Sequence, residues 1–234
     1  MATIIVPRRK GHDGVKTPAA RGMTIAAASL LAITLPFIGQ ARAQEELYAR
    51  PTGAPPASAL VVFHSRSGAT RAMASQIARR LEADMLPIKA KAYPEGFSGW
   101  QKAMEDSWNK KPSVIEPEKF DLRPYKLVLI GAPIWWYRPS PPVWTFVEKN
   151  DFTGLAVVLF STFNSGFKQE EIEQFKKLVE RQGGRFLDHI SIRRGRVYWQ
   201  KSQAELLEET DKIVEEKMEQ WRSVMERPAP IGAD

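Results

Sequence analysis

The sequence contains no cysteine, and this absence excludes several classes of protein. Without a thiol among its 234 residues, the chain cannot be a disulfide scaffold, an iron–sulfur protein, a thiolate zinc protein or an enzyme with a cysteine nucleophile. Histidine is scarce as well, since only His12, His64 and His189 occur, and we expect no metal site built from several histidines. The motif G-x-S-x-G is missing, which argues against a serine hydrolase.

The chain also has little excess charge outside its first 43 residues. The formal net charge is +7, but residues 1–43 hold six basic residues and one acidic residue. The remaining sequence then carries 28 basic and 26 acidic residues, a net charge of only +2. A body so close to neutrality gives no reason to expect binding to nucleic acid.

Residues 1–43 have the order of regions that is typical of a secretory signal peptide. A basic segment precedes the uncharged apolar residues 23–39, and the small residues Ala41 and Ala43 flank Arg42. We expect cleavage after Ala43 and a periplasmic or secreted location. An uncleaved anchor is the alternative, in which the leader would be the only membrane contact, although seventeen apolar residues fall short of the ~20 that a span needs. Arg8-Arg9 also leaves a twin-arginine route open beside export of the unfolded chain.

The rest of the chain divides into a connector at 44–58, rich in proline, alanine and glycine, a single domain at 59–226 and a tail at 227–234. Within the domain, short apolar runs alternate with segments of helical periodicity. We expect strands at 59–64, 85–90, 127–130, 156–161 and 185–192. We expect helices at 69–81, 100–108, 143–148, 168–182 and 206–221. Strands without polar alternation are covered on both faces, so the pattern predicts an α/β fold with a doubly wound parallel sheet.

The turn after the first expected strand carries groups that suit a phosphate. It consists of Ser65, Arg66, Ser67, Gly68, Ala69 and Thr70. Hydroxyl groups and a helix N-terminus bind anions well, because backbone N–H groups and the helix dipole face the ligand. A helix merely capped by Ser67 or Thr70 is the alternative. The turn matches neither G-x-G-x-x-G nor G-x-x-x-x-G-K-[ST], so the dinucleotide and ATP fingerprints are absent.

A segment rich in aromatic residues and proline follows the third expected strand. It contains Pro133, Ile134, Trp135, Trp136 and Tyr137. Neighbouring side chains of an extended segment point to opposite sides, so three consecutive aromatics cannot all enter one core. They suit a flat ligand that stacks on aromatic faces. A surface patch covered by the chain itself or by a second copy is the alternative.

A third polar segment, residues 161–167, follows the fourth expected strand and includes Thr162, Ser165 and Gly166. By itself it could be any turn between a strand and a helix. Ligands of open parallel sheets bind beyond the carboxyl ends of the strands, where these three segments would meet. Together they predict an anion site beside a stacking slot, which suits a mononucleotide with a planar ring such as FMN.

Several of these segments resemble the flavodoxin-like family, in particular its bacterial branch with a Pro-Ile-Trp-Trp loop. The resemblance covers about residues 59–196 and depends on SRSGAT at 65–70, AYPEGF at 92–97 and the runs at 131–154 and 157–167. It implies a five-stranded parallel sheet of order 2-1-3-4-5, non-covalent FMN and transfer of electrons singly or in pairs. The FMN contacts that it implies are Ser65, Arg66, Ser67, Gly68, Ala69, Thr70, Pro133, Ile134, Trp135, Trp136, Tyr137, Thr162, Ser165 and Gly166.

The sequence departs from the family pattern at a few positions. Ala69 replaces a common asparagine, Tyr137 replaces a glycine, and the third loop is about one residue shorter than is usual. Family members are typically acidic near the flavin ring, whereas this chain has four basic residues in or beside these loops, namely Arg66, Arg71, Arg138 and Lys168. We therefore expect a flavin that is less reducing than that of an acidic relative.

The function expected from the sequence is an exported FMN-binding redox protein whose partner is a redox protein or a quinone. Two alternatives stay open. One is a binding module of the same fold that has lost its FMN, and the other is an NAD(P)H-dependent quinone or flavin reductase.

Overall fold

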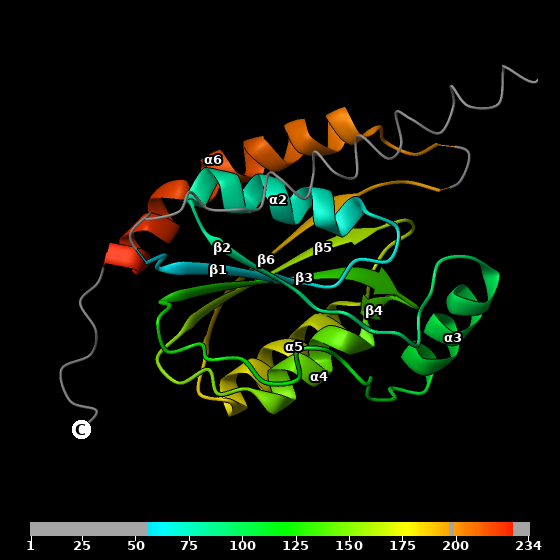
Figure 1. Cartoon of the computed structure of the whole chain (residues 1–234). Coiled ribbons are helices and arrows are strands. Elements are labelled where there is room, and N and C mark those ends of the chain that lie inside the picture. Colours follow the sequence, from blue (N-terminus) through cyan, green and yellow to red (C-terminus); the bar gives the residue numbers. More distant parts are fainter. Residues whose placement is uncertain (1–55, 197–198, 227–234) are drawn as a thin grey trace, which may run out of the picture. The chain divides into compact units, whose positions relative to one another are not determined.

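A parallel β-sheet forms the centre of residues 56–196 and 199–226, which the computed structural model describes (Figure 1). The strands are β1 (Ala59–Phe63), β2 (Asp84–Pro87), β3 (Leu127–Trp135), β4 (Arg138–Pro139), β5 (Ala156–Phe163) and β6 (Arg185–Arg193). The order is β2-β1-β3-β5-β6, and β4 pairs only with β3, antiparallel. The five parallel strands thus follow the expected 2-1-3-4-5 order, and the short β4 is an addition.

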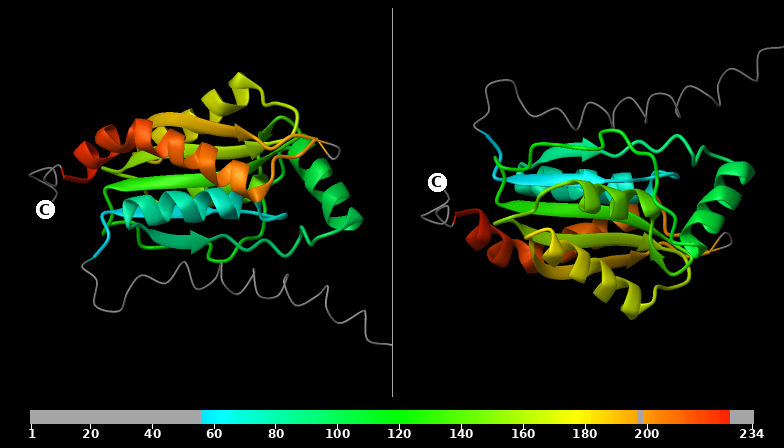
Figure 2. Two further views of the ribbon diagram at one scale, coloured as in Figure 1. Left: turned by 90° about the horizontal axis from the view of Figure 1, so that it is seen from above. Right: turned by 90° about the horizontal axis from the view of Figure 1, so that it is seen from below.

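Helices cover both faces of the sheet. They are α2 (Ala69–Leu81), α3 (Phe97–Trp108), α4 (Pro141–Lys149), α5 (Gln169–Arg181) and α6 (Gln203–Glu226). Helices α2 and α6 lie on one face, and α4 and α5 lie on the other (Figures 1 and 2). Helix α3 covers neither face, because it lies beyond the carboxyl ends of the strands (Figure 1). The flavodoxin-like α/β arrangement expected from the sequence is therefore confirmed.

Two apolar cores hold the layers together, one on each side of the sheet. Alternate residues of β1 point to opposite faces, so Val61 packs toward α2 and α6 while Val62 packs toward α4 and α5. Trp221 of α6 is fully buried in the first core, and Phe175 of α5 is fully buried in the second. Both faces of every central strand are covered, which explains why the strands lack polar alternation.

Strand β3 is longer than the sequence indicates. Residues 133–135, expected in a loop, continue the strand, because Pro133 pairs with Thr162 of β5 and Trp135 pairs with Arg138 of β4. Proline cannot donate a backbone hydrogen bond, so it argues against a central strand. Pro133 is tolerated because it lies where β3 leaves the sheet, and its carbonyl accepts a hydrogen bond from the Ser140 N–H at 3.0 Å.

Helix α3 buries a different face from the one its sequence suggests. The spacing of Trp100, Met104 and Trp108 indicates a stripe of core residues, yet both tryptophans are exposed. The buried side is formed instead by the small or polar residues Gly99, Ala103, Asp106 and Ser107. Gly99 is required there, because a Cβ at this position would lie 1.8 Å from the Pro94 carbonyl oxygen.

The leader 1–43, the tail 227–234 and all but the end of the connector lie outside the described residues. Ser58, assigned to the connector, belongs to the fold, because its carbonyl accepts hydrogen bonds from the N–H groups of Lys126 and Leu127. Among the described residues, no helix is both long enough and apolar enough to cross a membrane.

The packing of Gly131 predicts a stability effect. A Cβ on this residue of β3 would lie 2.2 Å from Cζ of Phe160, whose ring is fully buried and has no room to move. We expect Gly131→Ala to lower the free energy of unfolding by about 1–3 kcal/mol, as overpacked cores do. Chemical denaturation measures this, with Gly166→Ala as the control, because a Cβ there meets no atom within 4 Å. Equal stability of the two variants would contradict the packing argument.

Candidate functional site

A cavity of about 510 Å³ opens at the carboxyl end of the sheet. All three loops singled out from the sequence contribute to it. Its walls consist of Ser65, Arg66, Ser67, Ala69, Thr70, Trp100, Ala103, Met104, Pro133, Ile134, Trp135, Trp136, Thr162, Phe163, Asn164, Arg194 and Gln200. Of the predicted contact residues, Gly68, Tyr137, Ser165 and Gly166 do not line it. Two arginines and no carboxylate line the cavity, which therefore suits an anion.

The turn before α2 has the geometry of an anion site. Gly68 is the N-cap residue with a φ of 88°, and α2 has neither a side-chain cap nor an acidic residue in its first turn. A Cβ on Gly68 would meet nothing within 4 Å, so the space above the turn is open. The alternative of a helix capped by Ser67 or Thr70 is therefore wrong. Ser65 Oγ is buried and has no hydrogen-bond partner among the described residues.

Thr70 and Thr162 join the first and third loops. Their hydroxyl groups lie 2.8 Å apart and form a buried hydrogen bond between residues 92 positions apart in the chain. The bond fixes the start of α2 against the end of β5, so the phosphate-type turn and the third loop keep one relative position. Beyond Thr162, Ser165 Oγ accepts a hydrogen bond from Arg196 Nε at 3.3 Å and lies away from the cavity.

The aromatic segment is a β-hairpin rather than a loop. Trp136 and Tyr137 form its two-residue tip, with φ values of 49° and 66°. Such positive values match the tight turn that joins two antiparallel strands, but they cost bulky residues about 1–2 kcal/mol each. Tyr137 thus occupies, under strain, a position where the family implies glycine.

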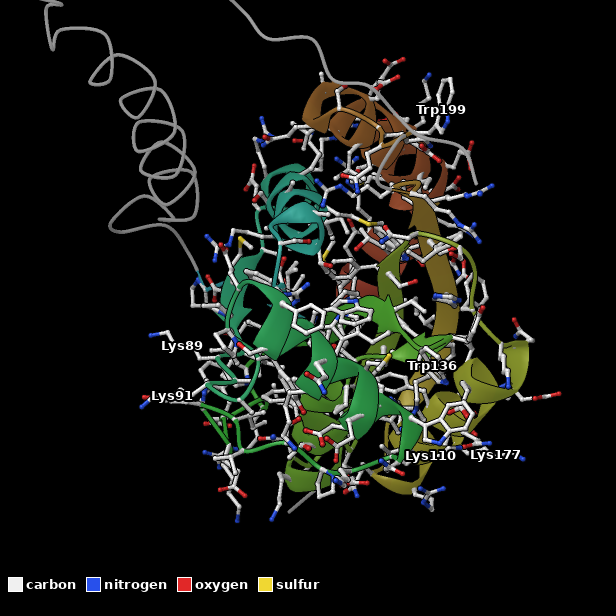
Figure 3. All side chains as sticks on the ribbon, turned by 90° about the vertical axis from the view of Figure 1, so that its right-hand side faces the viewer. Lys89, Lys91, Lys110, Trp136, Lys177 and Trp199 are labelled. Carbon is white, nitrogen blue, oxygen red and sulfur yellow. The ribbon has the colours of Figure 1, made fainter. Side chains whose placement is uncertain are left out.

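The three aromatic residues play different structural parts. Trp135 is half-buried, and its ring contacts the edges of His64 and Tyr93 at centroid distances of 5.4 and 5.1 Å. Trp136 is 44% exposed, lines the cavity and contacts Trp108 at 5.2 Å. Figure 3 looks onto this end of the sheet and shows Trp136 at the surface. Tyr137 is 45% exposed but does not line the cavity, so Trp136 is the exposed aromatic residue of the hairpin that a ligand in the cavity can stack on.

Arg138 does not lie beside the cavity, contrary to expectation. It is 6% exposed, and its Nε lies 3.1 Å from Glu171 Oε2 of α5. Its guanidinium also lies 4.4 Å from the centroid of Trp144. Burial lowers the pKa of Arg138, and the Glu171 carboxylate opposes that shift. Because the charge is neutralised by Glu171, Arg138 gives no support to the expectation of a less reducing flavin.

Several cavity residues escaped the sequence analysis. Helix α3 supplies Trp100, Ala103 and Met104, although the sequence predicted only a helix there and no ligand contact. Arg194 comes from the segment after β6, and its Nη1 donates a hydrogen bond to Ser67 Oγ at 3.3 Å. A signal was present in the sequence, since Arg193, Arg194 and Arg196 directly follow the carboxyl end of a strand.

A buried histidine, His64, and a half-buried histidine, His189, flank the site without lining the cavity. His64 Nδ1 lies 3.1 Å from the Ile88 carbonyl oxygen, and His189 Nε2 lies 2.8 Å from Ser161 Oγ. Burial lowers the pKa of His64 to about 4, and burial likewise lowers the pKa of His189 to about 4. Both side chains are therefore neutral near pH 7, and we interpret them as structural.

A doubly wound parallel sheet with a cavity beyond its carboxyl ends, formed by a phosphate-type turn and an aromatic hairpin, defines a flavodoxin-like protein. A family model described as Flavodoxin matches residues 58–202, which is more than half of the chain. The chain belongs to the flavodoxin family. No curated protein matches it.

Two solved structures with TM-scores of 0.50 or more share the fold at low sequence identity. A protein of Bacteroides uniformis classed as a flavoprotein is 21% identical with a TM-score of 0.53, over 67% of this chain and 99% of its own. A similar protein of Bacteroides eggerthii is 21% identical with a TM-score of 0.50, over 67% and 98%. A flavoprotein of Lactobacillus acidophilus, solved in complex with FMN, is 19% identical with a TM-score of 0.49, over 58% and 93%.

The lowered pKa of His64 predicts that acid weakens the fold. The unfolded chain takes up a proton near pH 6.5, whereas folded His64 stays neutral until about pH 4. Its contribution to stability is present above pH 6.5 and is lost as the pH falls to about 4, by about 3 kcal/mol. Denaturation of the wild type and of His64→Gln across this range measures the difference. If the difference in the free energy of unfolding between the wild type and His64→Gln does not change with pH, the prediction is contradicted.

Proposed function

We propose that this protein binds FMN non-covalently and transfers electrons through it, as a redox protein of the flavodoxin family. The observation that carries the proposal is the composition of one cavity. The start of α2, which has no side-chain cap, two arginines and several aromatic residues all contribute to it. Membership of the family supports a flavin as the ligand.

The residues of the phosphate-type turn fit the phosphate of FMN. Ser65 Oγ is buried without a partner, and the start of α2 offers a positive dipole end with no acidic side chain near it. Arg66 lines the same side of the cavity. These groups match a dianion far better than a neutral ligand. Ser65, Arg66, Ser67, Ala69 and Thr70, which line the cavity, would bind the phosphate, and Gly68 would give the turn its shape through its positive φ.

The opposite part of the cavity fits a planar ring. Pro133, Ile134, Trp135 and Trp136 of the hairpin and Trp100 and Met104 of α3 all line the cavity. Trp136 offers an aromatic face for stacking, and the apolar walls exclude water from the ring. When bound, the flavin would supply one- or two-electron chemistry, while the protein residues orient it and limit its access to solvent.

The partner that we propose is a redox protein or a quinone. Exposed aromatic side chains on α3 and on the hairpin, Phe97, Trp100, Trp108 and Trp136, lie near the cavity and offer apolar contact area. Exposed aromatic surface of this kind supports either partner.

We also propose that the protein is exported and acts in the periplasm or outside the cell. The order of basic, apolar and small-residue regions in residues 1–43 supports this. We expect the mature chain to begin at Gln44. N-terminal sequencing of the exported protein measures this, and a start at Met1 in a membrane fraction would favour an anchor instead.

The cofactor proposal predicts a yellow protein with a specific response to one substitution. Purified protein should show flavin absorbance, whereas a module that has lost FMN would show none. We expect Trp136→Ala to weaken FMN binding by about 1–3 kcal/mol, on the scale of base–aromatic stacking. Fluorescence titration measures the affinity.

Trp199→Ala is the matched control for this prediction, because Trp199 is 87% exposed and does not line the cavity. Its FMN affinity should equal that of the parent. If Trp136→Ala binds FMN like the parent, the hairpin serves another purpose. Oxidation of NADPH by the purified holoprotein would favour the reductase over the carrier.

A further inference from the structure

The two arginines that line the cavity, Arg66 and Arg194, have no acidic partner among the described residues, whereas some other arginines do. Arg80, Arg123 and Arg138 each pair with a carboxylate. Within the described residues, Arg66 and Arg194 have no carboxylate within 4 Å and bind only oxygens of neutral groups. Arg66 donates to the Gly96 carbonyl at 3.2 Å, and Arg194 donates to Ser67 Oγ at 3.3 Å. Their positive charges are therefore not neutralised within the cavity.

The backbone around Arg194 is fixed on both sides. Its N–H donates to the Phe163 carbonyl at 2.8 Å, which continues the pairing of β6 with β5. Its carbonyl accepts a hydrogen bond from the Lys201 N–H at 2.8 Å. Gly195 follows with a φ of 98°, and a Cβ there would lie 1.9 Å from the Trp199 carbonyl oxygen. The chain therefore reverses directly after Arg194, which keeps the start of this side chain beside the cavity.

Arg194 also reaches the phosphate-type turn from a distant part of the sequence. Its hydrogen-bond partner Ser67 is 127 residues away in the chain and belongs to the proposed phosphate contacts. The side chain is half-buried and lines the cavity. Arg193, its neighbour, is exposed, does not line the cavity and donates instead to the Asn164 carbonyl at 3.4 Å. Adjacent arginines thus point to different surroundings.

We propose that Arg194 is a specificity-determining residue that binds the terminal phosphate of the flavin and so selects FMN over riboflavin. The inference rests on the proposed function of the cavity. A guanidinium offers several N–H donors in a plane, which match phosphate oxygens, and charge-assisted hydrogen bonds are stronger than neutral ones. Arg66 supplies the second charge, so a dianionic phosphate meets two cations and a helix N-terminus.

The test compares two ligands that differ only in the phosphate. FMN and riboflavin are titrated into the flavin-free full chain and into Arg194→Gln, Arg194→Lys and Arg193→Gln. We expect Arg194→Gln to lower FMN affinity about tenfold, as the loss of a charge-assisted hydrogen bond does, and to leave riboflavin affinity within about twofold. Arg194→Lys should recover part of the loss. Added salt should weaken FMN binding more in the parent than in Arg194→Gln.

Arg193→Gln is the matched control, because it removes the same charge from the adjacent position. It should bind both ligands like the parent, and thermal melting checks that every variant is folded. Unchanged FMN affinity in Arg194→Gln would overturn the inference. An equal loss for FMN and riboflavin would overturn it too, since Arg194 would then only shape the cavity. If the parent binds neither flavin, the proposed function itself fails.

Discussion

The aromatic wall of the cavity depends on the buried ion pair between Arg138 and Glu171. Arg138 directly follows the strained tip of the hairpin, and Glu171 lies in the first turn of α5. Lys168, at the start of α5, adds a backbone hydrogen bond to the Tyr137 carbonyl at 2.8 Å. Ion pairs of this kind contribute little net stability, because both groups lose their hydration, but breaking one leaves an uncompensated charge. We interpret the pair as the anchor that keeps two aromatic residues at positive φ beside the cavity.

The remaining geometry of the site follows from the parallel sheet. The carboxyl ends of all parallel strands lie at one edge of the sheet. The segments that follow β1, β3 and β5 therefore meet at this edge, although they are far apart in the sequence. The Thr70–Thr162 hydrogen bond then joins two of them, and the extension of β3 carries the third beyond the sheet. Helix α3, beyond the carboxyl ends of the strands, adds Trp100 and Met104 to the cavity lining. The cavity is thus assembled from rigid elements, which preorganises it for a ligand.

Local sequence patterns predicted the fold well, because strands that are buried on both faces consist of consecutive apolar residues, which are easy to recognise. The bounds of α2 agree with its periodicity and with Gly68 at its start. Tertiary contacts decided the rest. Pro133 was assigned to a loop because its pairing with Thr162 depends on the register of β5. The spacing of Trp100, Met104 and Trp108 predicted a helix but not the contribution of α3 to the cavity, because spacing alone cannot distinguish a core from a cavity wall. Arg194 was missed because its partner Ser67 is 127 residues away, and the pairing of Arg138 with Glu171 leaves no local signal.

The positive charge of the site lies partly at other residues than the sequence suggested. The sequence places basic residues in or beside several loops, which suggested a cationic environment for a flavin ring. In the structure, Glu171 neutralises Arg138 away from the cavity, and the arginines that line the cavity are Arg66 and Arg194. Arg194 contacts the phosphate-type turn through Ser67, and Arg66 belongs to that turn. A dianionic phosphate beside these arginines would cancel most of their positive charge. Their electrostatic effect on a ring bound along the hairpin would then be small. If FMN binds as proposed, these arginines would favour the binding of its phosphate rather than shift its redox potential.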